Sequence, residues 1–127
     1  MNRILFVEDD EMSRDVISTR LTRSGYEVVV AEDGERALGI VSSQAFDLII
    51  LDMSMPGLSG WELAKKLKAS PSTAPIPILA LSAHTLNTDR KKALDSGCSD
   101  FDSKPVNLPR LLGKIEALLG SSKQPTT

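Results

Sequence analysis

Four short, uninterrupted apolar runs constrain the fold of this 127-residue chain more than any other feature. They are Ile4–Val7, Val28–Ala31, Leu48–Leu51 and Ile76–Leu81. A strand with one wet face alternates apolar and polar residues, whereas a parallel strand covered by helices on both faces is apolar throughout. The runs therefore predict parallel strands buried on both faces, and we expect a weaker fifth strand near residues 100–102.

Segments with helical periodicity separate these runs. The clearest is the last, where one helical face carries Leu108, Leu111, Leu112, Ile115, Leu118 and Leu119. Earlier helices are predicted over about residues 12–24, 35–43 and 60–69, with a more polar one over about 85–96. In the first of them the apolar positions are Met12, Val16, Ile17 and Leu21.

Glycines mark where three of these helices should stop. Gly25, Gly97 and Gly120 each follow a helical segment, where a left-handed closing residue is favoured and glycine adopts it without steric cost. Strand and helix thus alternate five times. Right-handed crossovers then predict an α/β fold, a five-stranded parallel sheet flanked by five helices.

Composition indicates one compact domain and excludes several kinds of partner. The chain is 41% hydrophobic and 25% charged, and its 17 acidic and 15 basic residues leave a net charge of −2. This balance provides no electrostatic footprint for nucleic acid or an anionic membrane. No apolar run approaches the roughly 20 residues that span a bilayer. We expect a folded domain over residues 1–120 and a flexible tail over 121–127.

Cys98 is the only cysteine, and the start of the chain carries no signal-peptide pattern. A lone cysteine cannot close an internal disulfide, so both features indicate a reducing compartment. The cytoplasm is the expected location.

Polar residues follow three of the four apolar runs. Glu8 and Asp9 follow the first run, Asp52 the third and Ser82 the fourth. Ligands of open parallel sheets bind at the carboxyl ends of the strands, where the strand order reverses. With the order 2-1-3-4-5, Asp9 and Asp52 would meet there. Two like charges about 4 Å apart repel by roughly 4 kcal/mol at a dielectric constant of about 20, which calls for a cation. Oxygen ligands favour Mg²⁺.

Each polar residue also has a simpler explanation. Asp10 and Glu11 fit ordinary helix capping, although capping explains poorly the two acids that come directly off the strand. Asp52 could be a turn former, Ser82 an N-cap and Lys104 a solvated lysine. Taken singly these residues are weak evidence, and their joint occurrence at the strand ends favours a site.

Four motifs in order resemble the receiver domain of two-component response regulators, the family that includes the single-domain chemotaxis regulator. They are Ile4–Asp10, Asp47–Gly57 with Gly60, Ala80–Ala83 and Phe101–Pro105. The resemblance extends from about Arg3 to Leu119. It implies a phosphorylation-activated switch that catalyses only its own phosphorylation and dephosphorylation.

The resemblance implies a ligand set for Mg²⁺ and an acceptor. Asp52 would accept the phosphoryl group. Asp9, Asp52 and the backbone carbonyl of Ser54 would bind Mg²⁺ directly, and Glu8 would contribute through a water molecule.

The resemblance also implies switch residues and partners. Ser82 would close on the phosphoryl oxygens, Lys104 would pair with them, and the rotamer of Phe101 would report the state. The Lys104–Pro105 peptide would be cis, and Ser54 and His84 would border the pocket and tune dephosphorylation. The donor would be a histidine kinase or a histidine phosphotransfer protein. A downstream protein target would bind the face formed by the fourth helix, fifth strand and fifth helix.

Three alternatives stay open at this stage. A Mg²⁺-dependent phosphohydrolase with an aspartate nucleophile generally has a second acid two residues later, where this chain has Ser54. A flavodoxin-like cofactor binder would need a phosphate loop where this chain carries acids. A docking module that is never phosphorylated is the third. With no output domain after the last helix, we expect action through a partner, or an origin in a longer protein such as a hybrid kinase.

Overall fold

The strands form one parallel sheet. The computed structural model describes residues 2–53, 60–82, 91, 95–104 and 106–123. Its sheet has the order β2-β1-β3-β4-β5, and every neighbouring pair is parallel. The strands β1 to β5 are Arg3–Val7, Glu27–Ala31, Leu48–Asp52, Ile78–Ser82 and Asp100–Ser103. The predicted strand order and the weak fifth strand are therefore confirmed.

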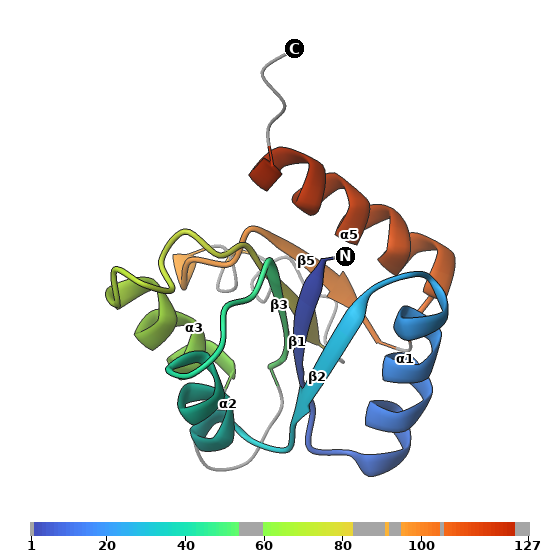
Figure 1. Ribbon diagram of the computed structural model, residues 1–127, viewed down its shortest axis with the longest axis horizontal. Coiled ribbons are helices and arrows are strands. Elements are labelled where there is room, and N and C mark those ends of the chain that lie inside the picture. Colours follow the sequence, from blue (N-terminus) through green and yellow to red (C-terminus); the bar gives the residue numbers. More distant parts are fainter. Residues whose placement is uncertain (1, 54–59, 83–90, 92–94, 105, 124–127) are drawn as a thin grey trace.

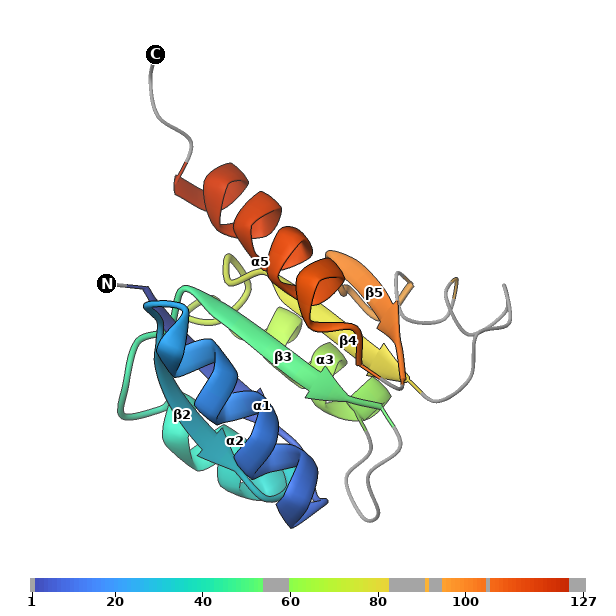
Figure 2. The same ribbon diagram turned by 90° about the vertical axis from the view of Figure 1, so that its right-hand side faces the viewer.

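Helices cover both faces of the sheet (Figure 1). Helices α1 and α5 lie on one face and α2 and α3 on the other, as the rotated view also shows (Figure 2). The bounds are Glu11–Arg23 for α1, Gly34–Val41 for α2, Gly60–Ala69 for α3 and Leu108–Lys123 for α5. The helix expected over residues 85–96 falls mostly outside the described residues. No helix in the described ranges is long and apolar enough to cross a membrane.

Because its central strands are apolar throughout, the sheet contributes side chains to two hydrophobic cores, one on each face. In β1, Leu5 and Val7 belong to the cluster under α2 and α3, whereas Ile4 and Phe6 belong to the cluster under α1 and α5. All four side chains are fully buried. The side chains of a strand point alternately to the two faces, so a strand between two helical layers must be apolar at every position.

Two sequence expectations about burial are wrong. Val28–Ala31 lies in the edge strand β2, where Val30 is 40% exposed, because an edge strand has sheet on one side only. Met12 and Val16 are 75% and 54% exposed, and only Ile17 and Leu21 of α1 are buried. At about 100° per residue, Val16 lies about 100° and Met12 about 140° around the helix from Ile17.

The stop expected at Gly25 is confirmed, Gly97 has the left-handed backbone expected of a stop, and the stop expected at Gly120 is wrong. Gly25 and Gly97 both have φ of +100°, the left-handed conformation that closes a helix. Gly120 lies inside α5, which runs to Lys123, so the helix includes the first part of the expected tail. A glycine costs a helix only about 1 kcal/mol relative to alanine, which the packing of the rest of α5 outweighs.

A half-buried lysine holds the segment after α3. The Lys68 ammonium donates hydrogen bonds to the carbonyls of Ala74 and Ile76 at 2.8 and 2.7 Å. Burial lowers the pKa of Lys68.

We expect Lys68→Met to lower the free energy of unfolding by about 2 kcal/mol, since hydrogen bonds to a charged group are lost. Urea denaturation would measure the change. The matched control is Lys66→Met at an exposed position of the same helix, which should stay within about 0.5 kcal/mol of the parent.

Candidate metal and acceptor site

Three carboxylates meet at the carboxyl ends of β1 and β3. Glu8, Asp9 and Asp52 each offer an oxygen, and these atoms all lie within 4.8 Å of one another. Glu8 and Asp9 directly follow β1, and Asp52 is the last residue of the neighbouring strand β3. Glu8 is 0% and Asp52 2% exposed, whereas Asp9 is exposed. The expectation that Asp9 and Asp52 meet across this edge is confirmed.

Lys104 brings a positive charge into the cluster. Its ammonium nitrogen lies 3.0 Å from Glu8 Oε1 and 3.1 Å from Asp52 Oδ2. The Lys104 backbone N–H donates to the carbonyl of Ser82 at 2.8 Å, which extends the pairing of β5 with β4 by one residue. Lys104 is therefore an internal counter-ion of the site, and the alternative of an ordinary solvated lysine is wrong.

The charges of the cluster shift one another's protonation. Burial, reinforced by the neighbouring Asp52, raises the pKa of Glu8 from 4.5 to about 7. Burial of the Lys104 ammonium opposes its charge, but the hydrogen bond to Glu8 and the charge of Asp52 outweigh it and raise the pKa of Lys104. One ammonium thus does not fully compensate three carboxylates, and the cluster retains an affinity for a further cation.

The loop after β1 combines capping with site formation. Asp10 is the N-cap of α1 and accepts a hydrogen bond from the Ser13 N–H at 2.8 Å, a bond that lowers the pKa of Asp10. The capping explanation is therefore right for Asp10. It does not extend to Glu8 and Asp9, whose carboxylates lie in the cluster.

Sequence reasoning missed Arg14, which fixes this loop. Its guanidinium donates to the backbone carbonyls of Glu8 and Asp9 at 3.0 and 3.3 Å. These bonds hold the main chain that carries two of the three carboxylates. The available signal was weak, namely a basic residue one turn into the helix that follows an acidic loop.

Of the remaining predicted site residues, two lie in described strands and three lie outside the described residues. Ser82 is the last residue of β4 and is 1% exposed, and Phe101 lies in β5 at 9% exposure. Ser82 therefore ends the strand next to β3, whereas Phe101 lies one strand further out, paired in register with Ala80. Ser54, His84 and Pro105 lie outside the described residues, so the expectations about them stay predictions.

Glu8 gives the metal-free protein a pH-dependent stability. Its pKa is about 7 in the fold and 4.5 ordinarily, so the folded chain keeps a proton that the unfolded chain releases. This contribution is complete below about pH 4.5 and is lost as the pH rises through about 7. In EDTA, Glu8→Gln should gain stability relative to the parent across this range. Urea titrations at several pH values would measure the difference in the free energy of unfolding between Glu8→Gln and the parent. A difference that does not increase with pH would contradict a raised pKa of Glu8.

Comparison with known proteins agrees with this geometry. Residues 4–116 match the family model of the response regulator receiver domain. The chain is 42% identical over 117 residues to the uncharacterized transcriptional regulatory protein YrkP of Bacillus subtilis, covering 92% of this chain and 49% of that protein. The chain spans between about a quarter and about half of the length of the curated relatives that it matches.

Solved structures share this fold over most of the chain. The chemotaxis protein CheY4 of Vibrio cholerae superimposes with a TM-score of 0.89 at 31% identity, covering 93% of this chain and 98% of that one. The receiver domain of the sensor histidine kinase PA1611 of Pseudomonas aeruginosa gives a TM-score of 0.87 at 31% identity, covering 94% of this chain and 98% of that one. Its structure has a magnesium ion coordinated in the active-site cleft.

The parallel sheet and its acidic edge define a receiver domain of two-component signalling. The chain belongs to the response regulator receiver domain family.

Proposed function

We propose that this chain is switched by transfer of a phosphoryl group from a phosphohistidine to Asp52. The observation that carries the proposal is the meeting of Glu8, Asp9, Asp52 and Lys104 at one edge of the sheet. In the transfer, a carboxylate oxygen of Asp52 forms a bond to phosphorus while the bond from phosphorus to the histidine nitrogen breaks. Such a reaction needs positioning and positive charge around the phosphoryl oxygens more than covalent help from the protein.

The carboxylates form a set that suits Mg²⁺. Asp9, Asp52 and the carbonyl of Ser54 would hold the ion, and Glu8 would act through a water molecule. These are hard oxygen donors, and burial together with the neighbouring Asp52 already raises the pKa of Glu8. When bound, Mg²⁺ supplies positive charge opposite the phosphoryl oxygens.

The protein's own groups complete the site. The Lys104 ammonium, 3.1 Å from Asp52 Oδ2, is within reach of an oxygen on a phosphoryl group carried by Asp52. The Ser82 hydroxyl would add a neutral donor from the end of β4. Its inward movement would leave space for the ring of Phe101, which couples the modification to the surface around β5 and α5.

The donor would be a histidine kinase or a histidine phosphotransfer protein, and a groove beside the site supports a protein donor. Met12 and Val16 of α1, with Val106 and Leu108, line a groove of about 310 Å³ that Lys104 also borders. Exposed apolar side chains beside an acceptor offer contact area to a protein that brings a phosphohistidine. A downstream protein would read the surface formed by β5, α5 and the helix expected over residues 85–96.

Acetyl phosphate tests the function without a partner. The protein is incubated with acetyl phosphate and Mg²⁺, and its intact mass is followed with time. We expect one phosphate adduct per chain in Mg²⁺ and none in excess EDTA. A module that acts only by docking would form no adduct under either condition, and that result would overturn the proposal.

A further inference from the structure

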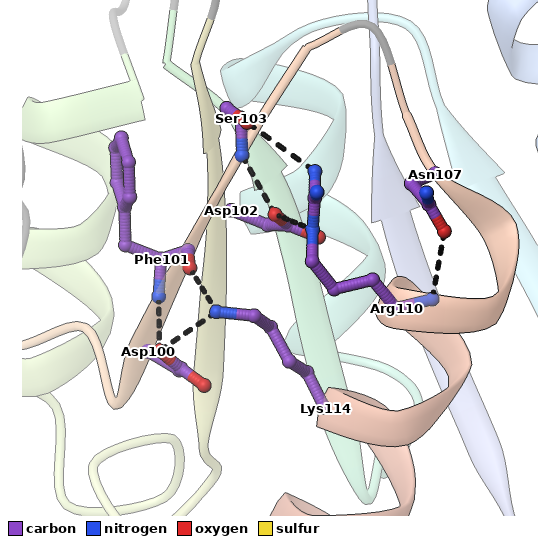
Figure 3. A network of polar contacts seen from close by, with 7 residues as sticks. All are labelled: Asp100, Phe101, Asp102, Ser103, Asn107, Arg110 and Lys114. Carbon is purple, nitrogen blue, oxygen red and sulfur yellow. Dashed lines mark hydrogen bonds and ion pairs between the residues drawn. The ribbon is translucent and has the colours of Figure 1, made fainter. Parts of the chain in front are cut away.

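Arg110, in the first turn of α5, binds the strand that leads to Lys104 (Figure 3). Its Nε donates to Asp102 Oδ1 at 2.8 Å, and a terminal guanidinium nitrogen lies 3.3 Å from Ser103 Oγ. The Ser103 backbone N–H donates to the same Asp102 oxygen at 2.9 Å. The end of β5 is thus attached to α5 by a small network of charged hydrogen bonds.

Lys114 makes a second attachment one turn further along α5. Its ammonium donates to the Phe101 carbonyl at 2.7 Å and lies 3.5 Å from Asp100 Oδ1. In Figure 3 both cations extend from the same helix to the same strand. All four residues of β5 therefore contact a cation of α5.

Stability alone does not account for the Asp102–Arg110 pair. Asp102 is 4% exposed and is paired in register with the fully buried Leu81. Its Oδ2 is buried and has no hydrogen-bond partner among the described residues. The Arg110 side chain is 45% exposed, so water screens much of its attraction to Asp102, and an unused carboxylate oxygen weakens the pair further. An apolar residue here would suit the core at least as well.

The place of the pair in the chain indicates what it does instead. Ser103 directly precedes Lys104, and a short connection then leads to α5. Asn107 caps that helix, and its Oδ1 accepts the Arg110 backbone N–H at 3.0 Å. The backbone N–H of Arg110 is therefore bound to Asn107 at the α5 end of this connection, and its guanidinium is bound to Asp102 and Ser103 at the β5 end. The connection that begins with Lys104 is held at both ends.

We infer that Arg110 is a positioning residue, which through Asp102 and Ser103 sets where the Lys104 ammonium lies between Glu8 and Asp52. The inference rests on the proposed function of Lys104. A displacement of about 1 Å in a reacting group can cost up to about 100-fold in rate. Without the network, Lys104 would keep its charge but lose its fixed position relative to Asp52.

The test replaces the ion pair by an apolar pair, Asp102→Val with Arg110→Leu, so that no buried charge is left alone. We expect an unfolding midpoint in urea close to that of the parent and phosphorylation by acetyl phosphate about tenfold slower. The matched control is Arg36→Leu on α2, which removes an exposed guanidinium and its ion pair with Asp33, the N-cap of that helix, and should leave the rate unchanged. A single variant, Arg110→Lys, keeps a charge opposite Asp102 and should slow the reaction by about threefold, which provides a second measurement if the pair variant folds poorly.

A double-mutant cycle separates positioning from a general structural effect. In a Lys104→Ala background the apolar pair should cause no further slowing, because Arg110 acts through Lys104. Continued tenfold slowing in that background would overturn the inference, as would equal rates in the parent and the variants.

A second readout does not depend on phosphorylation. In the metal-free protein, NMR can follow proton exchange of the Lys104 ammonium, which we expect to be at least tenfold faster in the apolar-pair variant. Unchanged exchange would overturn the inference. If the parent formed no adduct with acetyl phosphate, the proposed function would fail, and the exchange measurement would still decide whether Arg110 positions Lys104.

Discussion

Asp52→Asn should abolish the phosphate adduct formed with acetyl phosphate and Mg²⁺. The amide nitrogen and oxygen of asparagine keep the shape of the side chain but remove the anionic oxygen that attacks phosphorus. Because Asp52 is 2% exposed between two charged neighbours, asparagine also relieves part of the repulsion on Glu8. We therefore expect a folded variant that carries no phosphate, as measured by intact mass and urea denaturation.

Two controls give this result its meaning. Asp15→Asn changes an exposed aspartate on α1 and should keep a full adduct. Asp9→Asn keeps the acceptor but removes a carboxylate of the cluster, so its adduct should form slowly and need more Mg²⁺. An adduct of unchanged yield on Asp52→Asn would show that another side chain is the acceptor.

Gly60→Ala should lower the free energy of unfolding by about 3 kcal/mol, since overpacking a tight core costs 1–3 kcal/mol or more. A Cβ at Gly60 would lie 2.7 Å from both the Asp52 carbonyl oxygen and Met53 Cα, and would also contact Met53 Sδ. Two of these contacts are with backbone, which cannot move aside like the end of a side chain. Relief must shift the main chain at Asp52, so phosphorylation should also slow.

Gly39→Ala is the matched control within another helix. Nothing lies within 4 Å of a Cβ at Gly39, so the same substitution should raise the free energy of unfolding by about 0.5–1 kcal/mol. Urea denaturation of both variants checks the contrast. Equal stability of Gly60→Ala and the parent would mean that the approach of α3 to Asp52 is looser than the structure indicates.

The sheet order was predictable because its signals are local. Each fully buried strand reads as an uninterrupted apolar run, and the crossover rule then leaves few topologies. The exposure of Val30, Met12 and Val16 was not predictable in this way. An apolar side chain looks the same in the sequence whether its strand is central or at the edge, and whether it lies on the packed stripe of a helix or beside it.

The acidic part of the site was predictable in more detail than its cationic part. Glu8, Asp9 and Asp52 stand at the ends of two strands that pair with each other, so topology brings them together. Lys104 follows β5, two strands away from β3; its place at a strand end counted toward a site, and only the resemblance to a family gave it a role there. Arg14 and Arg110 act through backbone carbonyls and a buried aspartate, which depend on side-chain directions that no sequence spacing fixes.

The uniformly apolar strands have a further consequence for how the chain finds its alignment. When a strand is apolar on both faces, a shift in its register against the neighbouring strand still leaves apolar side chains on both faces. Burial of apolar residues alone therefore does not select one register. The carboxylates at the ends of β1 and β3 restrict the register. A shift of β3 by one residue toward the core would place the Asp52 carboxylate among apolar side chains. The acids that equip this edge for chemistry thus also act as stops that align the strands during folding.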